Sequence, residues 1–262
     1  MKKAESYPTP NYPMYARHPL DDFGKNGFCR YLVDGGHIAD LIKRGKDIAA
    51  SGTLIRDYKD AGVMKLDKAT LIENSTYYAE LLSKTGLFRA IQEDVNSTIF
   101  PRKITHTVSD KSTKTLLWHR DSYRHNGKQI GPLSPPLKLV VYLTDVDEHS
   151  GATGINPLLY DTDFNNRYID KLMAFLLKPF AKLHHLNAGS AILFDGRLLH
   201  CRTAHKRGQF RQAIIFSLSR DPTQLPTMDE IPTVHFEQPF GLLHALMKND
   251  QSYERRILQA LN

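Results

Sequence analysis

The sequence contains 262 residues with a formal net charge of +7 at neutral pH, and 41% of its residues are hydrophobic. A chain of this length and mixed composition is typical of a single globular domain with one substantial core. It has no leader-like segment and no apolar stretch long enough to cross a bilayer, so we expect a cytoplasmic protein with no membrane partner. Its two cysteines, Cys29 and Cys201, are far apart in sequence, which argues against a disulfide framework.

The positive charge is spread along the chain from Lys2 to Arg256 without a dense basic block. This distribution favours a solvated basic surface, and we do not expect a nucleic-acid partner. A charged cleft concentrates its counter-ions, so basic residues near a site favour an anionic small molecule. Four arginines cluster around the motifs described below and point to such a substrate: Arg120, Arg124, Arg197 and Arg202.

The first hundred residues are predicted to be a mostly helical support. Four prolines among residues 1–20 favour an extended arm. Apolar residues at helical spacing then predict helices over residues 37–50, 68–82 and 86–96, and Gly52 follows the first of these as a stop signal.

After Pro101 the sequence changes to short β-branched or apolar runs separated by Gly, Pro or Asp, which predict the strands of a sandwich or open barrel. A long excursion over residues 145–188 contains a helical pattern at 166–177 and is expected to be a lid insertion. We therefore expect one domain over residues 1–262 that is mainly β with flanking helices. Its parts are the support (1–100), the β core (101–220) and a C-terminal helical segment (221–262), and the expected strands are 104–108, 137–144, 190–194 and 212–218.

His119 and Asp121 form a His-x-Asp motif. In an extended strand residues two apart face the same side, so both side chains can reach one metal ion while Arg120 points away. A distal histidine, His200, would complete a set of two imidazoles and one carboxylate. That set leaves metal coordination positions open, as an iron(II) oxygenase requires, whereas a structural zinc site is closed by four ligands.

Several segments in order resemble the phytanoyl-CoA dioxygenase-like family of Fe(II)/2-oxoglutarate-dependent oxygenases. The resemblance spans most of the chain, and the ordered set of His-x-Asp, Ala-Gly-Ser before a strand, distal His and trailing Arg carries it. The matching segments are Asp22-Phe23-Gly24-Lys25-Asn26-Gly27-Phe28, Trp118-His119-Arg120-Asp121, Asp147-Glu148-His149-Ser150-Gly151-Ala152, Asn187-Ala188-Gly189-Ser190-Ala191-Ile192-Leu193-Phe194, Leu199-His200 and Arg211.

The resemblance implies a double-stranded β-helix, a jelly roll of the cupin-like kind, with the metal near its open end. It also implies the cofactors Fe(II), 2-oxoglutarate and O2, with His119, Asp121 and His200 as the catalytic metal ligands. Arg211 would bind the distal carboxylate of 2-oxoglutarate through parallel hydrogen bonds. Some relatives carry a hydroxyl two residues after that arginine, where this chain has Ala213, so another donor is expected, with Thr153 and Ser217 as the candidates.

Alternatives exist at several positions. His205 competes with His200 as the third ligand, but His200 is preferred because it follows the strand at the family-like position. Lys138 could replace Arg211. The substrate pocket could be lined by residues around the first motif, for which plain packing or exposure is an equal alternative: Trp118, Tyr123 and Arg124.

The expected activity is oxidation, most simply hydroxylation, of a C–H bond in a small molecule, with release of succinate and CO2. Desaturation and ring formation use the same centre. Asp121 stands where related halogenases have Gly or Ala, which favours hydroxylation-type chemistry. Two other functions are considered: oxidative demethylation of alkylated nucleic acid, and a non-catalytic jelly-roll binding module. Neither the substrate nor the oligomeric state follows from the sequence.

Overall fold

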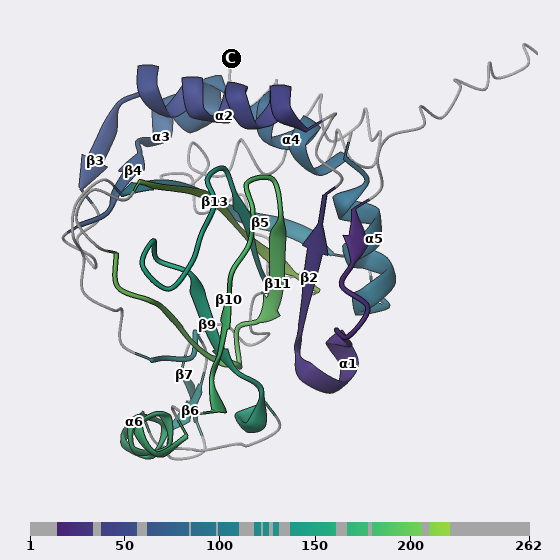
Figure 1. Ribbon diagram of the computed structural model, residues 1–262, viewed down its shortest axis with the longest axis vertical. Helices are drawn as coiled ribbons and strands as arrows, with labels where there is room; N and C mark the ends of the chain where they lie inside the picture. The colour runs from purple at the N-terminus through teal and green to yellow at the C-terminus, as the bar shows by residue number, and fades with distance from the viewer. Residues whose placement is uncertain are drawn as a thin grey trace, which may run out of the picture.

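The computed structural model describes residues 15–33, 38–56, 62–83, 85–97, 99–109, 118–121, 123–125, 128–130, 137–160, 167–177, 180–205 and 210–220. Within these ranges the chain forms two β-sheets that face each other, with helices on the outside of the larger sheet (Figure 1). No helix in these ranges has both the length and the apolar character needed to span a bilayer.

The larger sheet has eight strands in the order β1-β2-β11-β8-β13-β5-β4-β3. All of its pairs are antiparallel, and the longest pairing joins β13 to β5. Its strands, in chain order, are β1 (Ala16–Arg17), β2 (Phe28–Leu32), β3 (Leu54–Arg56), β4 (Met64–Leu66), β5 (Phe100–Ser109), β8 (Leu137–Tyr142), β11 (Ala191–Asp195) and β13 (Arg211–Ser219).

The smaller sheet contains β9 (Thr153–Asn156), β10 (Lys182–His184) and β12 (Leu199–Arg202) in the antiparallel order β10-β9-β12. An isolated antiparallel bridge between His119 and His200 adds a fourth segment at its edge. Two facing antiparallel sheets whose strands alternate along the chain form a double-stranded β-helix, so the predicted fold is confirmed.

One part of the predicted organisation is wrong. Residues 145–188 were expected to be a lid insertion, but the two ends of this stretch supply β9 and β10 of the smaller sheet. Only its middle departs from the core, as the 3-10 turn Pro157–Leu159 and the helix α6 (Arg167–Leu176). The strands were missed because the segments are short and end at polar residues.

The predicted N-terminal helices are confirmed, and they cover the outer face of the larger sheet. Three of them, α2, α3 and α4, lie along one end of the molecule, and α5 lies beside β2 (Figure 1). The helices are α1 (Phe23–Asn26), α2 (Ala39–Ser51), α3 (Lys68–Glu73), α4 (Ser75–Ser83) and α5 (Leu87–Val95). The second predicted helix is divided at Asn74, whose backbone N–H closes α3.

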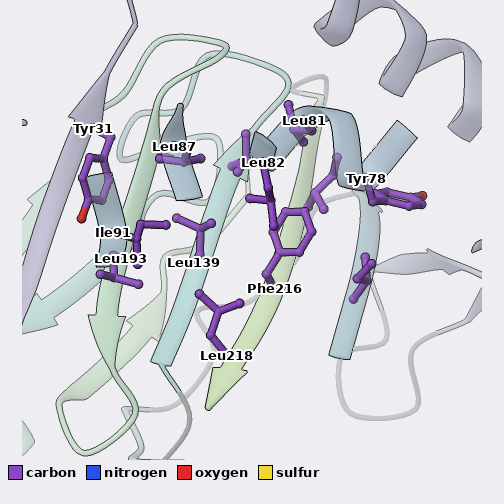
Figure 2. Packing of buried hydrophobic residues seen from close by; sticks show 14 of the residues in the cluster. Tyr31, Tyr78, Leu81, Leu82, Leu87, Ile91, Leu139, Leu193, Phe216 and Leu218 are labelled. Atoms are coloured by element: carbon purple, nitrogen blue, oxygen red, sulfur yellow. The ribbon is translucent and has the colours of Figure 1, made fainter. Parts of the chain in front are cut away.

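The main core lies between these helices and the sheet. Residues two apart on a strand share a face, and on β13 the outward set is Ile214, Phe216 and Leu218, all fully buried. Figure 2 shows Leu139, Phe216 and Leu218 of the sheet packed against side chains from the helices, Leu82 and Leu87 among them. Burial of many such side chains at ~25 cal/mol per Å² is the main stabilising term that holds the helices on the sheet.

A second apolar cluster fills the space between the two sheets. It is built from the alternate residues of the same strands, such as Val140 and Tyr142 of β8, Ala213 of β13 and Ile155 of β9. The space between the sheets is therefore mostly apolar. The candidate site lies where polar or charged side chains take the place of these apolar ones.

The remaining described elements are a small hairpin of β6 (Tyr123–His125) and β7 (Lys128–Ile130). The predicted C-terminal helix over residues 240–261, and most of the predicted N-terminal arm, lie outside the described residues.

Candidate metal centre and cosubstrate pocket

His119 and His200 face each other across an antiparallel bridge. The backbone N–H of each residue donates to the carbonyl oxygen of the other at 3.0 Å. Side chains of directly opposed residues project to the same face of a sheet, and here the two imidazole centroids are 4.3 Å apart. The bridge therefore joins the two predicted imidazole ligands, which come from distant parts of the sequence.

Asp121 joins this pair from the same segment as His119. Its backbone N–H donates to the carbonyl oxygen of Gly196 at 2.9 Å, which holds the segment along the edge of the smaller sheet. Asp121 Oδ1 is 4.0 Å from His119 Nε2, and one ligand atom from each of His119, Asp121 and His200 lies within 4.8 Å of the others. The His-x-Asp spacing thus places both side chains on the face predicted from the strand period.

The protonation state of His200 suits a metal ligand. Its Nδ1 lies 2.9 Å from the Leu198 carbonyl oxygen, which can only accept a hydrogen bond, so Nδ1 carries the proton and Nε2 keeps its lone pair. Burial lowers the pKa of His200 to about 4, and the neighbouring His119 acts in the same direction. The ring also packs against Phe194, with the ring centroids 4.7 Å apart. His200 is therefore a neutral, fixed donor near neutral pH.

The pKa of Asp121 is lowered. Burial alone would raise it, but the charge of Lys138 and the two imidazoles outweigh burial, so the carboxyl group is ionised. One carboxylate ligand and two imidazole ligands match the donor set of mononuclear iron(II) oxygenases, and three protein ligands leave further positions for small molecules. The residues therefore fit the predicted metal.

Arg211 lies at the start of β13 and is buried. Its guanidinium carbon is 5.4 Å from the centre of the Tyr142 ring, and its Nη1 is 3.5 Å from the Thr107 hydroxyl. The hydroxyls of Tyr142 and Thr153 are hydrogen-bonded to each other. The predicted residues Arg211 and Thr153 are thus brought into one polar region between the sheets, through Tyr142.

Gly151 makes room for this arginine. Its φ of +82° lies in the left-handed region, where glycine is not strained. A Cβ atom at this position would be 2.9 Å from Arg211 Cδ and 3.5 Å from Arg202 Nη1. The same distances place the side chain of Arg202 beside that of Arg211.

Tyr142 is a residue of the site that the sequence did not indicate, and Arg202 and Lys138 lie in places other than those expected: Arg202 is beside Arg211, and Lys138 is beside Asp121 instead of replacing Arg211. Arg202 is two residues after His200 on an extended strand, a spacing that could have indicated a shared face. Tyr142 and Lys138 alternate with outward residues of β8, but the outer and inner faces of this strand are both buried, so its sequence lacks a clear apolar and polar alternation.

Ser217, predicted to bind the cosubstrate, lies elsewhere on the inner face. Its hydroxyl oxygen accepts a hydrogen bond of 2.9 Å from Lys138 Nζ, and that ammonium is 3.5 Å from Asp121 Oδ2. Ser217 is therefore near the metal ligands, whereas Thr153 is near Arg211.

Trp118, one of the predicted substrate residues, lies on the other face of the smaller sheet. It packs with Leu199 and with Met173 and Leu177 from the α6 region, away from the metal ligands. This placement corresponds to the packing alternative. The side chains of Tyr123 and Arg124 lie outside the described part of the structure, and only their backbone in β6 is placed.

His205, the rival third ligand, is not part of the metal cluster. It is fully buried, its Nδ1 lies 2.9 Å from the Ser109 hydroxyl, and it forms a backbone bridge with Ser150. The choice of His200 over His205 therefore agrees with the geometry.

No model of a protein family matches this chain, and no curated protein matches it. Solved structures do match in fold. HygX from Streptomyces hygroscopicus, in complex with nickel, 2-oxoglutarate and hygromycin B, superposes with a TM-score of 0.61 at 15% identity, covering 76% of this chain and 85% of HygX.

Two further matches come from nogalamycin biosynthesis. SnoN, a non-heme alpha-ketoglutarate-dependent epimerase, has a TM-score of 0.58 at 16% identity and covers 75% of this chain and 80% of SnoN. SnoK, a non-heme alpha-ketoglutarate-dependent carbocyclase, has a TM-score of 0.55 at 13% identity and covers 75% of this chain and 81% of SnoK. The chain shares the fold of these proteins.

Proposed function

We propose that this protein is an Fe(II)- and 2-oxoglutarate-dependent oxygenase that oxidises a C–H bond of a small molecule. The observation that carries the proposal is the convergence of His119, Asp121 and His200 on one point between the sheets. The fold shared with proteins bound to 2-oxoglutarate, and the sequence resemblance to phytanoyl-CoA dioxygenase-like enzymes, support it.

His119, Asp121 and His200 would hold the iron. When bound together with 2-oxoglutarate and O2, the iron supplies the oxidising power for C–H cleavage, with succinate and CO2 as coproducts. Two of these ligands need no proton rearrangement, because His200 is neutral and Asp121 is ionised before the metal binds.

Arg211 would bind the distal carboxylate of 2-oxoglutarate. Arg211 is buried between the sheets, and its planar guanidinium can bind a carboxylate through two parallel hydrogen bonds. The Tyr142 ring lies beside this guanidinium, and its hydroxyl is hydrogen-bonded to that of Thr153, so these two hydroxyls would add hydrogen bonds to the carboxylate, and Arg202 would add a second positive charge. Arg202, which lies beside Arg211, follows His200 by two residues on β12. A cosubstrate bound to the metal would therefore reach Arg211 with its far carboxylate.

We further propose hydroxylation as the reaction and an anionic small molecule as the substrate. The intact carboxylate ligand Asp121 supports hydroxylation-type chemistry, although SnoN and SnoK catalyse epimerisation and carbocyclisation with the same cosubstrate. The arginines near the motifs support an anionic substrate: Arg120 lies beside the ligand segment, where its Nη1 donates to the Arg197 carbonyl oxygen at 2.6 Å, whereas the Arg197 guanidinium itself is paired with Asp195.

The proposal predicts that the purified protein, supplied with Fe(II), converts 2-oxoglutarate to succinate. His119→Ala should abolish the conversion, because two ligands cannot hold the iron in place. Succinate formation, measured by mass spectrometry, checks this. His185→Ala is the matched control, since its side chain is 54% exposed and pairs with Glu148 outside the site. Full activity of His119→Ala would rule out His119 as an iron ligand and contradict the proposed function.

A further inference from the structure

Lys138 is a positive charge on an otherwise apolar strand face. On β8 it shares the inner face with Val140 and Tyr142, both of which belong to the apolar cluster between the sheets. In the two neighbouring strands it lies opposite Phe194 and Ser217. Its side chain is only 22% exposed, and an ammonium in such a place is strongly disfavoured unless it is paired.

The partners of Lys138 are a hydroxyl and one particular carboxylate oxygen. Nζ donates to Ser217 Oγ at 2.9 Å and lies 3.5 Å from Asp121 Oδ2. The other oxygen, Asp121 Oδ1, faces His119 Nε2 at 4.0 Å. The two oxygens of Asp121 are therefore divided between the imidazole side and the ammonium side. Oδ2 is buried, and no hydrogen bond to it is formed within the described residues.

The separate surroundings of the two Asp121 oxygens affect how this residue can bind a metal. An aspartate can bind a metal through one oxygen or through both. Octahedral iron has about six positions, and the three protein ligands, a chelating 2-oxo acid and O2 fill them only if the aspartate uses one oxygen. A second aspartate oxygen on the metal would occupy a position that the cosubstrate or O2 needs.

We propose that Lys138 is a positioning residue that holds Asp121 Oδ2 away from the metal, so that Asp121 binds through Oδ1 alone. Ser217 acts with it by fixing the ammonium from the opposite strand. The proposal rests on the proposed function, because it concerns the ligand set of the same metal, and it assigns Ser217 a role other than contact with 2-oxoglutarate.

The test compares Lys138→Met, which has similar length without charge, with the charge-retaining Lys138→Arg. The probe is Co(II) added to apoprotein that carries 13C-labelled aspartate, and the readout is the infrared difference between metal-bound and apo protein. A carboxylate bound through one oxygen shows a wide separation of its two stretching bands, and one bound through both shows a narrow separation. We expect a wide separation in the wild type and in Lys138→Arg, and a narrow one in Lys138→Met.

The second readout is binding of 2-oxoglutarate to the Co(II)-loaded protein by calorimetry. Lys138→Met should keep its affinity for Co(II) but bind 2-oxoglutarate at least about tenfold more weakly, since one coordination position is taken. If Lys138→Met does not fold, Ser217→Ala, which releases the ammonium without removing it, should shift both readouts in the same direction.

An unchanged band separation in the folded variants would overturn the proposal, as would a loss of Co(II) affinity with unchanged binding of 2-oxoglutarate. These failures are distinct from failure of the proposed function. If the function is wrong, the wild type itself forms no succinate and its Co(II)-loaded form binds no 2-oxoglutarate.

Discussion

Two glycines of this protein share a left-handed backbone but differ in what surrounds them. Gly151 has a φ of +82° and lies against Arg211 and Arg202, whereas Gly86 has a φ of +72° and nothing within 4 Å of the place where a Cβ would be. Both would be strained by alanine to a similar degree, about 1 kcal/mol. Only alanine at Gly151 would also displace Arg211, the arginine proposed to bind the cosubstrate.

Gly151→Ala should therefore weaken binding of 2-oxoglutarate while Gly86→Ala leaves it unchanged. The added methyl would lie 2.9 Å from Arg211 Cδ, so the guanidinium has to move. Because a displaced guanidinium loses its paired geometry with a carboxylate, we expect the dissociation constant to rise by about tenfold or more. Calorimetry on metal-loaded protein measures it, and equal affinities for the two variants would show that Arg211 does not bind the cosubstrate.

The elements of the fold are joined by a buried polar network on the outer side of the larger sheet. His106 of β5 lies 3.1 Å from the Tyr78 hydroxyl of α4 through Nδ1, and 2.9 Å from Gln212 Nε2 of β13 through Nε2. The Gln212 amide also donates to the carbonyl oxygen of Gly45 in α2 at 3.0 Å. Gln212 follows Arg211 and points to the opposite face, so the network fixes the strand that presents the arginine.

This network predicts a pH dependence of stability. Burial lowers the pKa of His106 to about 3 from its usual value near 6.5. The unfolded chain therefore takes up a proton from about pH 6.5 downward while the folded protein does not, and the stability due to neutral His106 is lost as the pH falls toward 3. The contribution is on the order of a few kcal/mol.

Chemical denaturation at several pH values between 7 and 4 measures this effect, because the free energy of unfolding should decrease through that range. His106→Gln removes the titrating group, so its unfolding free energy should fall less steeply. The buried His184 and His200, whose pKa values are also lowered, account for the part that remains. Identical slopes for the wild type and the variant would contradict the assignment of His106.

At the scale of the whole molecule, several of the positive charges are balanced by neighbouring carboxylates. Within the described residues, at least eight of the Lys and Arg side chains pair with Asp or Glu: Arg17–Asp94, Arg30–Asp21, Lys43–Asp47, Arg44–Glu80, Arg89–Glu93, Lys138–Asp121, Arg197–Asp195 and Arg220–Asp195. The Lys and Arg residues are also spread along the sequence from Lys2 to Arg256 without a dense basic block.

We accordingly predict that the protein does not form a specific complex with single-stranded oligonucleotides at low ionic strength, where phosphate contacts are strongest. Fluorescence anisotropy with a labelled oligonucleotide checks this, and a poly-lysine peptide serves as the positive control. Tight binding that weakens steeply with added salt would instead favour the nucleic-acid demethylase alternative.

The features that could be predicted from the sequence are those that depend on residues close together along the chain. The amphipathic helices before Pro101, the strands over 104–108, 137–144, 190–194 and 212–218, and the shared face of His119 and Asp121 follow from periods of 3.6 and 2 residues. The resemblance to a known family extended these local features to the jelly-roll fold, to His200 as the remaining proposed metal ligand, and to Arg211 as the proposed cosubstrate arginine.

The pairing of segments that are distant in the sequence is known from the three-dimensional structure and not from local patterns. The strand roles of β9 and β10, the bridge that brings His119 to His200, and the meeting of Lys138, Ser217 and Asp121 depend on the register between strands far apart in the sequence. Local periodicity reports which face of a strand is buried but not which residue lies opposite. A one-residue shift of register would move each of these side chains to the other face, so the site exists only in the assembled sheets.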